Sequence, residues 1–275
     1  MPPLLLSLLF LAACNLSPGD WFLRLRPHVS AHFRNLPERS VEPGWQKLAR
    51  EHQVRITAAT LQIRSIDLLA AAGTSQPFDP ANPPPGFSLC HGGHCHASDG
   101  RLVAYEDVAA EASGRTTGPV IAASVAGGTW DLLAPAVPIL LPCPGAPDCR
   151  SGRANITRAR IDFAGIRIEG EVRDGPGTLQ PIGPATFVVN LNHSNGPLSA
   201  LIVPLALPAD NRHDPDVAVT FALAPTVALL DEVLWAAHVV VQGHIDLNSS
   251  PQAPVTRAAL NEALTRIPIA VHMQR

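Results

Sequence analysis

Alternation of apolar and polar residues over two long segments is the sequence feature that most limits the fold. In the first segment Val54 and Ile56, then Leu61 and Ile63, alternate with polar or charged neighbours, and the phase of the pattern slips near Ser65. A period of two places successive side chains on opposite faces of a strand, and a slip in its phase indicates a β-bulge. The segment is therefore predicted to be one long, bulged strand.

The same pattern recurs one hundred residues later. Residues 156–168 repeat it, with Phe163 at the position that matches Ile63 and with Gly165 at the slip. The recurrence indicates an internal duplication, although any two long amphipathic strands would share part of it.

The abundance of proline and glycine, 28 and 20 residues respectively, favours many short strands, because proline is excluded from central strands and from helix interiors. Further strands are predicted at residues 119–125, 137–141, 186–191, 201–207, 217–223 and 238–247. Short helices are predicted at residues 42–52, 105–112, 226–236 and 257–266, the last with Thr256 as its N-cap. The expected fold class is mainly β: a β-sandwich-like fold with a few short decorating helices and long loops rich in proline and glycine.

The composition narrows the class of protein. Hydrophobic residues make up 46% of the chain and the net charge is −3, which excludes a disordered chain and leaves no basic footprint for a nucleic-acid partner. Residues 43–275 are expected to form the β-sandwich domain, and a division into two β subdomains that meet near residues 175–181 stays open.

The N-terminus has the features of an export signal. Residues 4–13 form an apolar run that is too short to span a bilayer and has the length of a signal-peptide core. The run ends Leu11-Ala12-Ala13-Cys14, which resembles the lipobox of bacterial lipoproteins.

That resemblance implies that residues 1–13 are a signal peptide, that Cys14 is lipidated, and that residues 14–42 carry the anchor and an N-terminal spacer segment. The protein is then expected in the bacterial cell envelope, held to a membrane by its N-terminal lipid and facing the periplasm or the cell surface. No Lys or Arg precedes the apolar run, so an ordinary cleaved signal peptide with Cys14 near the cut is the alternative.

The most chemically specific stretch is Cys-His-Gly-Gly-His-Cys-His at residues 90–96. A Gly-Gly pair between matched residues predicts a two-residue hairpin turn, because glycine adopts positive φ without a Cβ clash. His91 then faces His94, and Cys90 faces Cys95 within reach of a disulfide. Alternation puts His91, His94 and His96 on one face of the hairpin and both cysteines on the other.

The remaining cysteines support this pairing. Apart from Cys14, the chain has two locally spaced pairs, and turn residues separate Cys143 from Cys149. We therefore expect two local disulfides, Cys90 with Cys95 and Cys143 with Cys149, as suits an oxidising compartment.

Three imidazoles on one face predict a transition-metal site, because neutral imidazole suits copper and zinc and three such ligands leave one position open. Asp99, His193, His238 and His244 are candidates for further ligands, with His238 and His244 expected on the polar face of one strand. The bland interpretation is that the hairpin is only a stapled loop.

Catalysis has little support in the sequence, which lacks a G-x-S-x-G elbow, a P-loop and an H-E-x-x-H helix. Two functional hypotheses follow. The first is an exported, lipid-anchored protein that binds copper or zinc through the hairpin. The second is a non-catalytic structural or interaction β-sandwich lipoprotein without metal.

Overall fold

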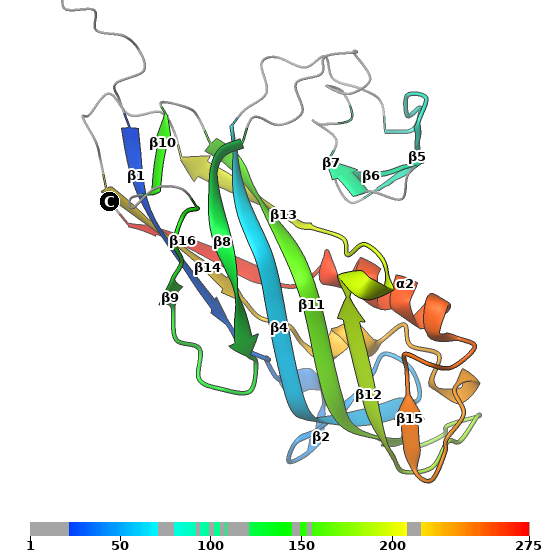
Figure 1. Cartoon of the computed structure of the whole chain (residues 1–275). Helices are drawn as coiled ribbons and strands as arrows, with labels where there is room; N and C mark the ends of the chain where they lie inside the picture. The colour runs from blue at the N-terminus through cyan, green and yellow to red at the C-terminus, as the bar shows by residue number, and fades with distance from the viewer. Residues whose placement is uncertain are drawn as a thin grey trace, which may run out of the picture.

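A computed structural model describes residues 22–70, 80–91, 94–98, 102–104, 108, 121–144, 149–152, 156–207 and 216–274. Within these residues the protein is mainly β, as the sequence predicts. A five-stranded and an eight-stranded sheet share one hydrophobic core, and a separate three-stranded sheet lies beside them (Figure 1).

Two long antiparallel strands form the centre of the eight-stranded sheet. They are β4 (His52–Ala70) and β11 (Ile156–Asp174), the two segments of the sequence repeat, and they pair along nearly their whole length. The other strands of this sheet are β2 (Ser40–Glu42), β3 (Trp45–Lys47), β8 (Ile121–Asp131), β12 (Ala185–Asn192), β13 (Leu201–Leu207) and β15 (His244–Asp246).

The register confirms both predicted bulges. Between β4 and β11 the pairing shifts on either side of Phe163, so that Ser65 faces Asp162 while Gly165 faces Gln62. Ile63 pairs directly with Phe163, and these two residues are equivalent positions of the repeat. An approximate twofold axis through this pair therefore relates the two strands.

The second sheet covers the inner face of the first. It consists of β1 (Phe22–Ala31), β9 (Ile139–Leu140), β10 (Cys149–Gly152), β14 (Asp216–Leu223) and β16 (Ile269–Gln274). Buried residues of both sheets, among them Val29, Phe221, Leu61 and Phe163, belong to one core.

Residues 14–42 are expected to carry the anchor and a spacer, but β1 occupies part of this segment, which corrects the expectation. This strand lies inside the sheet, runs parallel to β14, and buries Leu25 and Val29 in the core. The sequence hides it because Arg24, Arg26 and Pro27 interrupt the run. All described elements lie from Phe22 onward, so a chain that begins at Asn15 contains every one of them.

The prediction of a helix at residues 42–52 is wrong, because this range contains the end of β2 and the whole of β3. Gly44, with a φ of 81°, makes the turn between β2 and β3, and Trp45 packs inward with Arg55 and Arg173 beside its ring. Two cation–π contacts and the glycine turn favour a hairpin over the helical spacing that the sequence offers.

The helix expected at residues 226–236 is present only as two 3₁₀ turns. These are η3 (Val227–Leu230) and η4 (Trp235–Ala237); two further 3₁₀ turns are η1 (Pro37–Arg39) and η2 (His193–Asn195). The side chain of Thr226 caps η3 by accepting from the amide of Ala228. The helix expected at residues 105–112 lies outside the described residues except for Val108.

The C-terminal helix, α2 (Ala253–Leu264), begins earlier than predicted. Pro254 lies in its first turn, and Thr256 is an interior, buried residue rather than the N-cap. The expected strand at residues 238–247 shrinks to β15, because Gln242 and Gly243 have positive φ and turn the chain back on itself. The other predicted strands correspond to β8, β9, β12, β13 and β14.

The bulge near Ser65 depends on a glycine of the neighbouring strand. A Cβ on Gly127 would lie 1.8 Å from the carbonyl oxygen of Ile63. We expect Gly127→Ala to lower the free energy of unfolding by about 3 kcal/mol, because two backbones must separate. Gly177→Ala is the control: it has open space but a φ of 82°, and should cost only about 1 kcal/mol. Equal losses in urea unfolding would contradict this.

Candidate metal site at the histidine hairpin

The histidine hairpin, residues 87–97, has the predicted pairing of His91 with His94 and of Cys90 with Cys95. It consists of β5 (Phe87–His91) and β6 (His94–Ala97), with β7 (Leu102–Ala104) on the far side of β6. A disulfide joins Cys90 to Cys95, whose Cα atoms are 4.0 Å apart, and a second disulfide joins Cys143 to Cys149. Both predicted pairings are confirmed.

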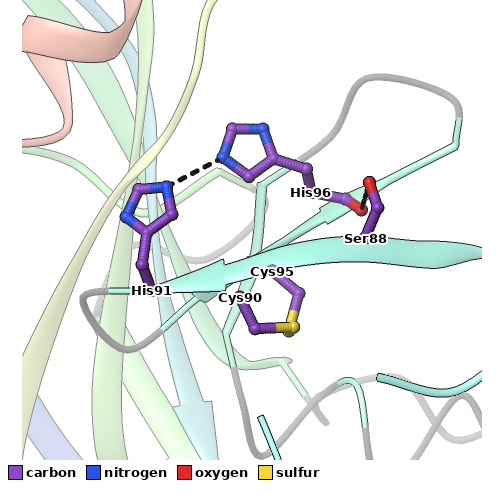
Figure 2. The surroundings of a disulfide bond; sticks show 5 residues. All are labelled: Ser88, Cys90, His91, Cys95 and His96. Carbon is purple, nitrogen blue, oxygen red and sulfur yellow. Dashed lines mark hydrogen bonds between the residues drawn. A yellow bond between two sulfur atoms is a disulfide. The ribbon is translucent and has the colours of Figure 1, made fainter. Parts of the chain in front are cut away.

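The two faces of the hairpin differ in environment. On the cysteine face, Cys95 is fully buried with Ala97, Val103 and Val108 in a small core of its own, and Phe87 packs against it. On the other face His91 is exposed and His96 is half-buried. Figure 2 shows both imidazoles on the side opposite the disulfide. The alternation of the strand therefore separates a stapled interior from a histidine surface.

A bulge at Leu89 shifts the register between β5 and β6. Leu89 has a φ of 39°, and His96 pairs with Ser88 instead of with Leu89. The sequence prediction did not include this bulge, since a leucine rarely adopts positive φ.

The imidazoles of His91 and His96 point at one another. Their Nε2 atoms are 3.2 Å apart, and their ring centroids are 5.3 Å apart at an interplanar angle of 37° (Figure 2). In the metal-free chain the two nitrogens can share a proton in a hydrogen bond.

The backbone of His94 is described and its side chain is not, while Asp99 lies outside the described residues. Among the side chains that are described, no three His, Cys, Asp or Glu residues gather in a group able to hold a metal ion. The described part of the hairpin thus supplies two imidazoles. His94 is placed only by its backbone, which pairs with His91.

The other predicted ligands are separate from the hairpin. His193 donates from Nε2 to the carbonyl of Phe163 at 2.9 Å, and His244 bonds through Nδ1 to Thr186 at 2.9 Å. His244 is on β15, at the opposite end of the long sheet from β5, β6 and β7 (Figure 1).

His238 does not share a polar strand face with His244, which corrects the sequence prediction. It is 4% exposed, with Nε2 2.9 Å from the hydroxyl of Thr256 and Nδ1 2.7 Å from that of Ser250. Both ring nitrogens are thereby occupied in tying η4 to α2. Burial lowers the pKa of His238, because the charged ring would lose its solvation.

A cavity of about 550 Å³ is a feature that the sequence reasoning missed. Three segments distant in sequence form it, at residues 50–52, 179–180 and 233–237, so no local motif could have indicated it. His52 Nε2 and Trp235 Nε1 are buried near it without hydrogen-bond partners. Both nitrogens are shielded from solvent, and the lining of the cavity combines Leu179 and Val233 with the polar residues Arg50, Glu51 and Gln180.

Comparisons with known proteins identify no relative of this chain. No family model, no curated protein and no solved structure matches the chain. In the described part of the chain, no helix is both long and apolar enough to cross a membrane.

The buried histidines make a prediction about acid stability. Burial also lowers the pKa of His52, against the opposing charges of Asp174 and Glu51. Below the ordinary histidine value of 6.5, the unfolded chain therefore binds more protons than the folded chain, so stability falls as the pH falls. We expect His238→Gln to lose less melting temperature than the wild type between about pH 7 and about pH 5. Exposed His244→Gln is the control and should follow the wild type; identical curves for all three proteins would contradict the prediction.

Proposed function

We propose that this chain is an exported, lipid-anchored protein of the bacterial cell envelope that binds copper or zinc through the histidine hairpin. His91 and His96 are the first two ligands of the proposed site, and His94, the strand partner of His91, is the third. A fourth position is left for water or for an exchangeable ligand.

The observation that carries this proposal is the 3.2 Å separation of the two Nε2 atoms. If both metal–nitrogen bonds are about 2.05 Å long, the N–metal–N angle at the ion is about 100°. This follows because half the separation divided by the bond length is the sine of half that angle. The N–metal–N angle is close to tetrahedral geometry, so the separation of the two nitrogens suits ligation of one ion.

The surroundings of the pair support a site that is organised before the ion arrives. The disulfide holds β5 to β6 directly behind His91, and the buried contacts of Cys95 hold β6 to β7. Because these contacts limit the movement of the strands, less conformational entropy is lost when the rings bind an ion.

Export and anchoring rest on the sequence of residues 1–14, which lie outside the described residues. The two disulfides are compatible with this, since such bonds persist mainly in oxidising compartments. The first described strand begins at Phe22, only eight residues after Cys14, so a lipid there would hold the domain close to the membrane.

The second candidate function, a structural or interaction β-sandwich without metal, is favoured by the other interpretation of the same contact. A 3.2 Å separation also fits a hydrogen bond between two neutral imidazoles. The two functions differ in whether the purified chain retains metal.

The first test is metal content per chain, measured by elemental mass spectrometry on a chain that begins at Asn15, kept oxidised and desalted after exposure to copper and zinc. We expect close to one ion per chain. The variant His91→Ala/His94→Ala/His96→Ala should lose it and keep its melting curve, because the imidazoles of His91 and His96 lie on the side of the hairpin opposite the disulfide (Figure 2).

The matched control is His28→Ala/His244→Ala/His272→Ala, which removes three histidines elsewhere in the structure. This variant should retain the ion. Wild-type protein without metal, or equal loss in both triple variants, would favour the metal-free sandwich.

The proposed site should also release its ion in acid. Ligating imidazoles must be neutral, so protonation competes with the metal as the pH falls below about 6. Metal retained after dialysis over a pH series should fall as the pH is lowered, with a midpoint set by the competition between protons and the ion. Retention that does not change with pH would contradict imidazole ligation.

A further inference from the structure

An entirely apolar segment lies exposed at the edge of the five-stranded sheet. Residues 133–140, here called the apolar strip, read Leu-Ala-Pro-Ala-Val-Pro-Ile-Leu, and all eight are exposed. Leu133, Val137, Ile139 and Leu140 keep 46%, 63%, 47% and 57% of their surface in contact with solvent. A contiguous exposed run of this kind marks an interaction surface in a soluble fold.

The strip is held in place by the sheet. It leaves the end of β8 and returns along β1 on the side that Figure 1 shows at the left, where Leu140 pairs with His28 and Ile139 with Val29. The amide of Leu141, the next residue, donates to the carbonyl of Pro27. The strip is therefore a fixed feature of the edge.

Half of the residues of the strip have no amide that needs water. The amides of Leu133 and Ala134 donate to Asp131, and Pro135 and Pro138 have no amide hydrogen. Removing a peptide amide from water is costly unless it is bonded. These four positions lower the cost of moving the strip into the boundary between lipid headgroups and acyl chains.

The neighbouring strand adds positive charge and the attachment point. Arg26 is exposed and lies two residues before His28, the partner of Leu140. An arginine beside an apolar segment suits anionic lipid headgroups. β1 spans about 30 Å at 3.3 Å per residue. The eight residues from Cys14 to its start can extend over a similar length, so a lipid on Cys14 can reach a membrane that the strip also contacts.

We propose that the apolar strip is the face of this protein that contacts a lipid bilayer, with Arg26 next to anionic headgroups. The inference rests on the proposed function for the lipid at Cys14, which would hold β1 and the strip against the same membrane. The strip adds a second, non-covalent contact, and the pair of contacts orients the folded domain with one edge toward the bilayer.

The test measures binding of the unlipidated chain that begins at Asn15 to vesicles of phosphatidylcholine mixed with phosphatidylglycerol. The strip variant is Leu133→Ser/Val137→Ser. The matched control is Leu179→Ser/Val239→Ser, at two residues exposed by 83% and 66% in other loops. Each protein is first checked for its melting temperature, and only variants that match the wild type are compared.

We expect the strip variant to bind about tenfold more weakly, since two large apolar side chains no longer leave water, while the control binds like the wild type. Arg26→Gln should lose most of the difference between mixed vesicles and pure phosphatidylcholine. Wild type that does not bind vesicles, or equal weakening in both serine variants, would overturn the proposal. So would a dimer in sedimentation that depends on the strip without vesicle binding, which would assign the strip to a second copy.

Metal content of the same serine variants separates this inference from the proposed function. The strip substitutions should leave the retained metal unchanged, and the histidine substitutions should leave vesicle binding unchanged. Either property can thus fail without the other.

Discussion

The pairing of β4 with β11 is the interaction on which the rest of the structure depends. Every other strand of the eight-stranded sheet is joined to this pair directly or through one neighbour, and the second sheet packs against its apolar face. The bulges on either side of Ile63 and Phe163 let two strands of nineteen residues twist together while keeping their apolar faces inward. A partly buried ion pair supports the outer face at one end, where Arg160 bonds to Asp67 on β4 at 2.6 Å. Separating β4 from β11 would remove the surface on which both sheets assemble.

The histidine hairpin is organised differently. It has its own small core around Cys95, and none of its described residues belongs to the large core. A two-stranded hairpin is marginal in water by itself, and β7, the small core and the disulfide between Cys90 and Cys95 support it where the histidines lie. The proposed metal chemistry therefore depends on a local covalent link, whereas the proposed membrane contact depends on the strip at the edge of the main fold. The two surfaces belong to different parts of the molecule, so a membrane-bound domain can keep its histidines in the aqueous phase.

Much of the fold was predictable from local sequence, and the failures share one physical cause. Period-two alternation predicted β4 and β11, and Gly92 with Gly93 predicted the hairpin register, because both signals act between near neighbours in the chain. The sequence reasoning failed for β1 and Trp45. β1 is a strand because β14, nearly two hundred residues later, pairs with it in parallel. Trp45 is buried because Arg55 and Arg173 flank it. No pattern within a short window contains such partners.

By itself the sequence determined the mainly β class, the two long bulged strands, both disulfide pairings and the presence of histidines on one hairpin. These follow from side-chain alternation, glycine turns and short covalent loops, all of which act over a few residues. The local bulge at Leu89, which the sequence did not indicate, decided that the ring of His91 meets that of His96. Only the tertiary structure decided that His238 is an interior hydrogen-bonded residue and that residues 133–140 stay exposed. Those two outcomes depend on contacts between different segments of the chain, where packing and solvent exclusion outweigh the local preferences of each residue.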